Sequence, residues 1–158
     1  MKKISAVLIL HDIRSAHNVG AIFRTADAVG ITKIYLTGIT PLPIDRFGKA
    51  RKDITKAALG AENTIPWESK KMIQPLITTL QKEGFFVAAI EQSDRSIDYK
   101  KYKPSTNVAF VLGNEVSGIA ERILSRCDSV LEIPMRGKKE SLNVSVAAGI
   151  VLYQTLRI

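Results

Sequence analysis

Short apolar runs alternate with helical patterns along the chain, and this alternation constrains the fold more than any other feature. The apolar runs cover residues 5–10, 33–38, 85–91, 108–113 and 129–134. Strands separated by helices predict an α/β fold with a mostly parallel sheet. The runs are continuously apolar, which predicts that helices cover both faces of this sheet. A length of 158 residues fits a single domain spanning residues 1–158.

The first helical pattern covers residues 18–29 and has a regular apolar face. Asn18 stands where an N-cap is expected, and Gly30 where a C-terminal cap is expected. Further helices are predicted over residues 49–60 and 72–84, and after the loop that begins at residue 114.

The final helical pattern, residues 141–157, has almost no polar face. A helix that is apolar all round is usually buried on all sides. One subunit of this size can hardly bury its last helix so completely, so a second copy would cover the remaining face. The pattern therefore predicts a homodimer.

Composition limits the class of protein and of partner. The net charge of +8 favours nucleic acid or another anionic partner over a merely solvated surface. The single cysteine, Cys127, excludes an intrachain disulfide and favours a reducing compartment, which we expect to be the cytoplasm. Apolar runs are too short to cross a bilayer, and no metal-ligand spacing is present, so neither a membrane nor a metal is expected.

Polar clusters follow three of the apolar runs, at residues 11–24, 112–119 and 134–143. Ligands of α/β proteins bind outside the carboxyl ends of the strands, so these clusters should surround one pocket. Neither a phosphate-binding P-loop nor a G-x-G-x-x-G dinucleotide motif is present, which speaks against nucleotide-binding sites of those kinds.

Three ordered strings within these clusters carry a family resemblance: "NVGAIFRTA" at 18–26, "VLGNEVSGI" at 111–119 and "SLNVSVAAGIVLY" at 141–153. The chain resembles the SpoU/TrmH family of RNA 2′-O-ribose methyltransferases, in the SPOUT superfamily. The resemblance implies an α/β domain with a C-terminal deep trefoil knot and a homodimer. It also implies S-adenosyl-L-methionine (AdoMet) as cofactor and methyl transfer to a ribose 2′-hydroxyl.

The resemblance also implies two sets of site residues. The cofactor-binding set is Leu112, Gly113, Asn114, Ile133, Met135, Ser141, Leu142 and Asn143. The catalytic set is Arg24, Asn18, Glu115, Ser141 and Asn143. We expect Arg24 to hold the target phosphate and stabilise an emerging alkoxide, because a guanidinium stays protonated in proteins and cannot serve as a general base. We expect Glu115 to pair with Arg24 or to position the ribose.

Each of these residues also has a purely structural interpretation. Asn18 and Ser141 could cap helices, Arg24 could form a salt bridge with Asp27, and Glu115 could be an exposed loop acid.

Basic residues expected at RNA phosphates are Arg14, Arg24, Arg136, Lys138 and Lys139. A separate basic cluster, Lys49, Arg51, Lys52 and Lys56, has no assigned role, and the lysines at 100, 101 and 103 are expected in a solvated turn. The chain begins at its first strand with no N-terminal RNA-binding extension, which favours tRNA over ribosomal RNA as substrate. The alternative is an inactive RNA-binding module of the same fold.

Overall fold

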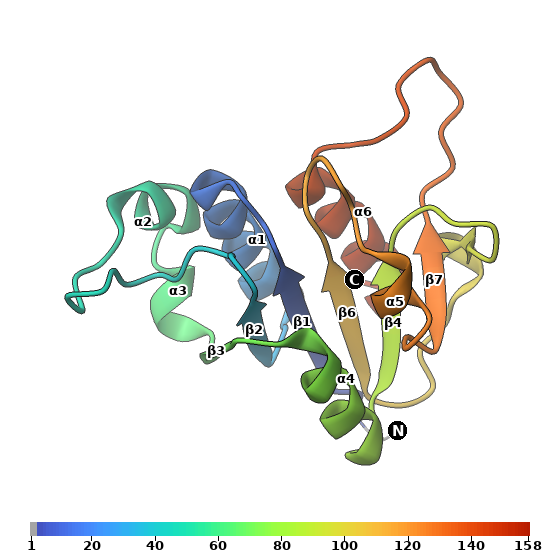
Figure 1. The fold of residues 1–158 in the computed structure, drawn as a ribbon, viewed down its shortest axis with the longest axis horizontal. Coiled ribbons are helices and arrows are strands. Elements are labelled where there is room, and N and C mark those ends of the chain that lie inside the picture. Colours follow the sequence, from blue (N-terminus) through green and yellow to red (C-terminus); the bar gives the residue numbers. More distant parts are fainter. Residues whose placement is uncertain (1–2) are drawn as a thin grey trace.

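A wholly parallel, seven-stranded sheet forms the centre of the protein, with strand order β3-β2-β1-β6-β4-β7-β5 (Figure 1). The computed structural model describes residues 3–158. The strands are β1 (Ala6–His11), β2 (Lys33–Thr37), β3 (Trp67–Lys70), β4 (Phe86–Ile90), β5 (Ile97–Asp98), β6 (Val108–Leu112) and β7 (Ser129–Glu132). The α/β class and the parallel sheet expected from the apolar runs are confirmed.

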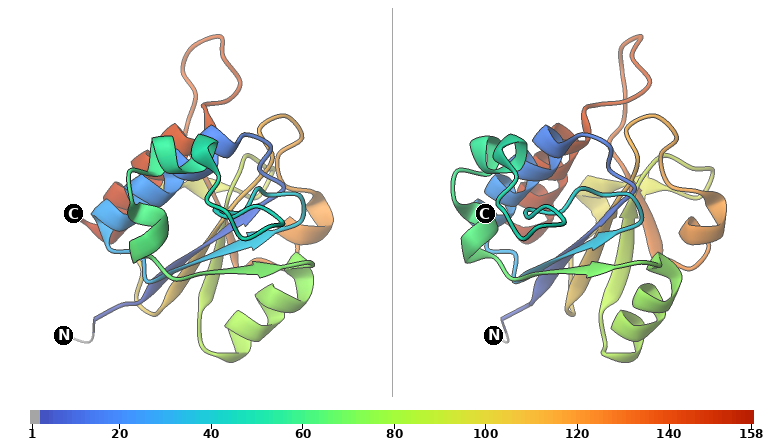
Figure 2. Two further views of the ribbon diagram at one scale, coloured as in Figure 1. Left: turned by 90° about the vertical axis from the view of Figure 1, so that its left-hand side faces the viewer. Right: turned by 60° about the vertical axis from the view of Figure 1, so that its left-hand side comes forward.

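Helices cover both faces of this sheet, as the continuous apolar runs predict (Figure 2). One side holds α1 (Ala16–Val29), α2 (Lys52–Ala58), α3 (Ala61–Thr64), α6 (Val144–Leu156) and the 3₁₀ turn η1 (Tyr99–Lys101). The other side holds α4 (Ile73–Lys82) and α5 (Glu121–Leu124). In β1, Leu8 and Leu10 pack toward the α1 side and Val7 and Ile9 toward the α4 side, so successive side chains fill two separate cores.

Helix α1 begins earlier than its sequence pattern indicated, and Asn18 is not its N-cap. Ser15 caps the helix, and its hydroxyl accepts a hydrogen bond from the Asn18 backbone N–H at 3.2 Å. Asn18 therefore lies in the first turn, where its side chain is free for other contacts. Gly30 ends the helix as expected, in the left-handed conformation (φ 77°).

The sequence pattern missed the two edge strands of the sheet. β3 has the sequence "WESK" and β5 is only two residues long. A polar strand with one solvated side gives no apolar run, and two residues give no pattern at all. The sheet is consequently wider than the apolar runs alone indicate.

The last helix differs from its prediction in two ways. It begins at Val144, with Asn143 as N-cap, so residues 141–143 are not helical. In the single chain it is not buried all round, because Val146 is 50% exposed and Tyr153 is 44% exposed. Its apolar outer face is therefore open to solvent in one copy of the chain.

Gly20 allows α1 and α2 to pack in close contact. A Cβ atom on Gly20 would lie 2.5 Å from the Ile54 carbonyl oxygen and 2.8 Å from the Ala57 Cβ. Both distances are shorter than van der Waals contact, and the first neighbour is backbone that cannot rotate away. Gly20 thus fixes the spacing between the helix of the first motif and α2.

We expect Gly20→Ala to push α2 away from α1 and to lower the free energy of unfolding by about 1–3 kcal/mol, the usual cost of overpacking. Gly149→Ala is a matched control, because the nearest side-chain atom to a Cβ there is the Thr25 methyl at 3.9 Å. The control should be neutral or slightly stabilising, since alanine favours helix. Chemical denaturation of both variants measures the difference, and equal stabilities would contradict this account of Gly20.

Candidate functional site

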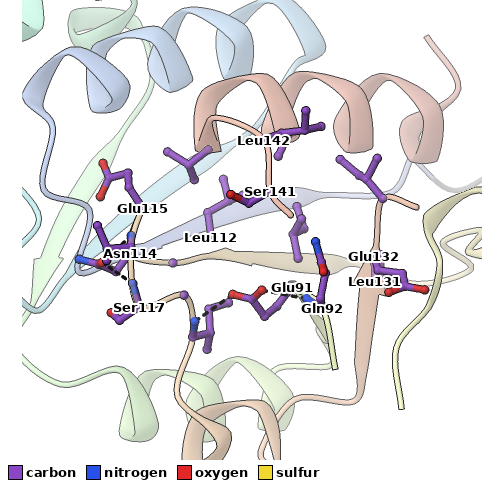
Figure 3. A pocket seen from close by; sticks show the side chains of 18 of the residues that line it. Glu91, Gln92, Leu112, Asn114, Glu115, Ser117, Leu131, Glu132, Ser141 and Leu142 are labelled. Atoms are coloured by element: carbon purple, nitrogen blue, oxygen red, sulfur yellow. Dashed lines mark hydrogen bonds between the residues drawn. The ribbon is translucent and has the colours of Figure 1, made fainter. Parts of the chain in front are cut away.

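A cavity of about 340 Å³ lies at the carboxyl ends of β4, β6 and β7, where the second and third polar clusters meet (Figure 3). This volume is within the range of small-molecule sites. Its predicted lining residues are Leu112, Gly113, Asn114, Ile133, Met135, Ser141 and Leu142. The structure thus brings together all of the expected cofactor residues except Asn143, which lies beside the cavity at the start of α6.

Sequence reasoning missed the contribution of β4 to this cavity. Ile90, Glu91 and Gln92 line it from the end of that strand. Glu91 accepts hydrogen bonds from the backbone N–H groups of Ile119 (3.0 Å) and Gln92 (2.8 Å). The rule that identified the other clusters, a polar residue after an apolar strand, also applies to Glu91.

Two glycines let the chain after β6 fold tightly against the cavity. A Cβ on Gly113 would collide with the Ile119 side chain, and one on Gly118 would collide with the Glu91 carboxylate. Gly118 also has a positive φ of 65°, which other residues rarely adopt. Backbone rather than side chain therefore forms this part of the cavity wall.

Asn114 lines the cavity, but its side chain mainly holds the backbone in place. Its Oδ1 accepts hydrogen bonds from the N–H groups of Val116 and Ser117, both at 2.9 Å. Its Nδ2 donates to the Asp12 carbonyl oxygen at 2.8 Å, which ties the turn after β6 to the end of β1. Asn114 thus joins two of the predicted clusters.

Glu115 connects the same two clusters, residues 11–24 and 112–119, through three hydrogen bonds where Asn114 uses one. Its Oε2 accepts a hydrogen bond from the Arg14 backbone N–H (2.9 Å), and its Oε1 accepts from the Ser15 N–H (3.1 Å) and the Asn18 amide (3.1 Å). The carboxylate lies at the N-terminus of α1, where the helix dipole favours negative charge. The expected pairing of Glu115 with Arg24 is not seen within residues 3–158, where the carboxylate instead binds the backbone just before α1 and the Asn18 amide.

These contacts set the ionisation of Glu115. Burial acts to raise the pKa of its carboxyl, but the hydrogen bonds from Arg14, Asn18 and Ser15 outweigh burial and lower the pKa below its usual 4.5. Glu115 is therefore ionised at neutral pH.

Asn18 extends the network to the third cluster. It is 6% exposed, and its Oδ1 accepts a hydrogen bond from the Asn143 amide at 3.2 Å. Asn143 Oδ1 in turn accepts from the Ser145 backbone N–H at 2.8 Å, which caps α6. One chain of hydrogen bonds therefore connects the N-termini of α1 and α6 to the loop after β6.

Arg24 is not part of this network. It lies six positions after Asn18, a rotation of about 240° around the helix, so the two side chains leave α1 in different directions. Arg24 is exposed, does not line the cavity, and forms no salt bridge within residues 3–158. The alternative of a bridge to Asp27 is not seen, because Asp27 instead accepts a hydrogen bond from Thr64.

The other basic residues expected at RNA are exposed near the cavity. Arg14 lies just before α1, and Arg136, Lys138 and Lys139 lie on the loop between β7 and α6, which projects from the body of the protein (Figure 1). Gln92 holds one end of this loop by donating a hydrogen bond to the Glu140 carbonyl oxygen. Positive charge therefore borders the cavity on an open loop.

The described part of the chain offers neither a metal-binding cluster nor a helix of membrane length. Residues 3–158 contain no cluster of three or more His, Cys, Asp or Glu side chains that could hold a metal ion. None of the helices in this range is both long and apolar enough to span a membrane.

Comparison with protein families and curated proteins gives a consistent match. Residues 5–153 match the model of the SpoU rRNA Methylase family. A protein of Staphylococcus aureus (strain MSSA476), whose name assigns it to the TrmH family of tRNA/rRNA methyltransferases, is 33% identical over 154 residues. The match covers 98% of this chain and 59% of the relative, so the chain spans about three fifths of the length of such relatives.

Solved structures are similar over nearly the whole chain. An AdoMet-bound rRNA methyltransferase from Sinorhizobium meliloti is 27% identical with a TM-score of 0.87, covering 99% of this chain and 57% of that one. The A. aeolicus TrmH/SpoU tRNA modifying enzyme is 27% identical with a TM-score of 0.85, covering 99% of this chain and 76% of that one.

The Glu115 network generates a prediction for stability. Glu115→Gln should lower the free energy of unfolding by about 1–3 kcal/mol at neutral pH, because one amide cannot accept all three hydrogen bonds. The lowered pKa means that the carboxylate stabilises the fold above its usual pKa and loses this effect as pH falls through the folded-state value. The stability difference between wild type and Glu115→Gln should therefore shrink on acidification.

Denaturation at a series of pH values measures this difference. Glu140→Gln, an exposed acid whose side chain forms no hydrogen bond within residues 3–158, is the matched control and should behave like wild type throughout. A Glu115→Gln deficit that persists unchanged at low pH would show that packing, not charge, stabilises this site.

Proposed function

Because the chain belongs to the SpoU rRNA Methylase family, we propose that it transfers a methyl group from AdoMet to a ribose 2′-hydroxyl of structured RNA. The observation that carries the proposal is the cavity at the carboxyl ends of β4, β6 and β7, joined to α1 by Glu115 and Asn18. Two of the family's sequence motifs form the cavity and the third is held against it.

The cavity fits AdoMet in size and in chemistry. Leu112, Ile133 and Leu142 offer apolar surface for an adenine ring, while the backbone after β6 and the Ser141 hydroxyl offer polar contacts. Glu91 adds negative charge to the wall, which suits a cofactor with a positive sulfonium. The AdoMet-bound Sinorhizobium meliloti structure, similar over 99% of this chain, supports the same cofactor here.

AdoMet would supply a methyl group activated by its sulfonium, and would leave as the neutral thioether. The RNA 2′-oxygen gains the new C–O bond and releases its proton to water. Arg24 cannot accept that proton, because a guanidinium is not deprotonated in proteins. We propose instead that the Arg24 guanidinium binds the target phosphate with two hydrogen bonds and stabilises the developing alkoxide.

Glu115, Asn18 and Asn143 act as positioning residues in this proposal. Glu115 and Asn18 fix the first turn of α1, and Asn143 fixes the start of α6 relative to it. Their hydrogen bonds keep the helix that carries Arg24 at a constant distance from the cavity. Arg14, Arg136, Lys138 and Lys139 would bind RNA phosphates beside it.

We propose tRNA as the first substrate to test and ribosomal RNA as the second, both in the cytoplasm. The A. aeolicus relative is named as a tRNA modifying enzyme and the Sinorhizobium meliloti relative as an rRNA methyltransferase, and each is 27% identical to this chain, so both substrates are tested.

The proposal extends to assembly and topology. A second copy of the chain would cover the exposed apolar face of α6, which includes Val146 and Tyr153. The family's C-terminal deep trefoil knot is proposed for the segment from the loop after β6 to α6. The match of residues 5–153 to the SpoU rRNA Methylase family supports this proposal.

Methyl transfer can be tested directly with purified protein, labelled AdoMet, and unfractionated tRNA or ribosomal RNA in separate reactions. We expect label in a 2′-O-methylated nucleoside after digestion, and an increase in thermal stability when AdoMet is added, since only the folded state forms the cavity. RNA binding without either effect would instead identify an inactive RNA-binding module.

Arg24 should matter for turnover but not for cofactor binding. We expect Arg24→Ala to lower single-turnover methylation by about 10² or more, the effect of removing one oxyanion donor. Arg24→Lys should recover little activity, because a single ammonium cannot replace a two-pronged guanidinium. AdoMet affinity, measured by calorimetry, should be unchanged because Arg24 does not line the cavity. Full activity in Arg24→Ala would refute the role.

The dimer is tested by sedimentation at micromolar concentration, where wild type should have the mass of two chains. Val146→Glu places a charge on the exposed α6 face and should shift the mass toward one chain. Met72→Glu, an equally drastic change at a residue 59% exposed on the α4 side, should leave the mass unchanged. A wild-type protein that sediments as one chain would contradict the proposal.

A further inference from the structure

A hairpin at residues 44–50 projects at one end of the molecule, and β7 lies at the other end (Figure 1, left and right). Ile44 and Ala50 pair across it, and the Asp45 backbone N–H donates to the Lys49 carbonyl oxygen at 2.7 Å. Asp45 Oδ1 accepts hydrogen bonds from the N–H groups of Phe47 (2.8 Å) and Lys49 (3.0 Å). Gly48 completes the turn with a φ of 76°. The tip therefore has a defined conformation.

Phe47, at this tip, is 72% exposed. The hairpin thus holds an aromatic ring in solvent, where it contributes little to the folded state. The Arg46 guanidinium carbon lies 4.8 Å from the ring centroid, which brings a cation to the ring. An ordered turn that presents an exposed aromatic side chain beside a cation is suited to a planar, electron-rich ligand.

Four of the cations near the hairpin lack an acidic partner in the described part of the chain. Arg46, Lys49, Lys52 and Lys56 are exposed and form no salt bridge within residues 3–158. Lys52 and Lys56 are four residues apart and so share one face of α2. The acids of this segment are already engaged, since Asp45 holds the hairpin and Asp53 pairs with Arg51 at 2.7 Å. We call Arg46, Phe47, Lys49, Lys52 and Lys56 the hairpin surface.

Hydrogen bonds and close packing connect the hairpin surface to the elements beside the cavity. The segment leading to it is fixed at the carboxyl end of β1 by Thr40, whose hydroxyl accepts from the Ile13 N–H (3.1 Å) and donates to the Leu10 carbonyl (2.8 Å). The segment after it enters α2, which packs closely on α1 at Gly20. One RNA molecule could therefore contact both the cavity end of α1 and the hairpin on a single packed body.

We propose that the hairpin surface is a second RNA-docking site, at which an unpaired base stacks on Phe47 and the surrounding lysines bind flanking phosphates. Base stacking on an aromatic side chain together with basic residues is how proteins bind single-stranded RNA. The proposal rests on the proposed function, in which RNA is the substrate. It adds one requirement: the substrate RNA should contain an unpaired segment distant from the modified nucleotide.

The test uses the full chain and two fluorescein-labelled probes, a single-stranded RNA and a blunt RNA duplex of the same length. We expect Phe47→Ala to weaken binding of the single strand about tenfold, the scale of one lost stack, and to leave duplex binding within twofold of wild type. Phe47→Trp should retain the affinity. Lys52→Gln should weaken binding of both probes. For the single strand, the slope of log binding constant against log salt concentration should become shallower by about 0.7, because one phosphate contact is lost.

Two control variants show whether the loss of affinity is specific to the hairpin surface. Met72→Ala removes an exposed apolar side chain on the opposite side of the sheet, and Lys101→Gln removes a charge from η1, which follows β5 at the opposite edge of the sheet; both should bind like wild type. Thermal stability and sedimentation mass should not change in Phe47→Ala. A changed mass would overturn the proposal in favour of a protein contact, and unchanged single-strand affinity would overturn it outright.

Methyl transfer, measured in parallel, separates the two proposals. If wild type methylates RNA while Phe47→Ala binds the single strand normally, the hairpin proposal fails and the proposed function stands. If Phe47→Ala loses single-strand affinity but wild type transfers no methyl group, the hairpin surface stands and the proposed function fails.

Discussion

The hydrogen bonds to the Glu115 carboxylate organise the rest of the site. They connect the loop after β6 to the first turn of α1 through Arg14, Ser15 and Asn18. Three donors around one partly buried anion give the contact both strength and direction, because charge-assisted hydrogen bonds are stronger than neutral ones. Asn18 passes this constraint to Asn143 and α6. The loop after β6, the start of α1 and the start of α6 are far apart in sequence, and these hydrogen bonds hold them together beside the cavity.

The parts of the fold that could be predicted are those where both faces of a strand are buried. Burial of both faces makes β1 and β6 continuously apolar, so the sequence shows them clearly. β3 has an open edge and carries charge, so its sequence resembles a loop. The same reasoning located the cavity, since polar residues after buried strands must gather at one edge of a parallel sheet. Glu91 satisfies that rule and could have been found with it.

Side-chain direction, by contrast, could not be predicted from the motifs. Glu115 and Arg24 have opposite charges and lie in adjacent motifs, which suggests a pair. The outcome depends on where each side chain leaves its helix or loop, and Asn18 rather than Arg24 faces the carboxylate. The predicted N-cap is wrong for a related reason, since Ser15 and Asn18 are both good caps and only the backbone conformation decides between them.

The glycine positions around the cavity have a consequence for inhibition. Main chain forms the wall at Gly113 and Gly118, and any larger residue there would collide with Ile119 or Glu91. A small molecule that bound against this wall would contact backbone atoms, which remain in place whatever side chain a mutation introduces. Substitutions that reshape the wall would also disturb the turn on which the cavity depends. Resistance by point mutation would therefore have few routes open to it at this part of the surface.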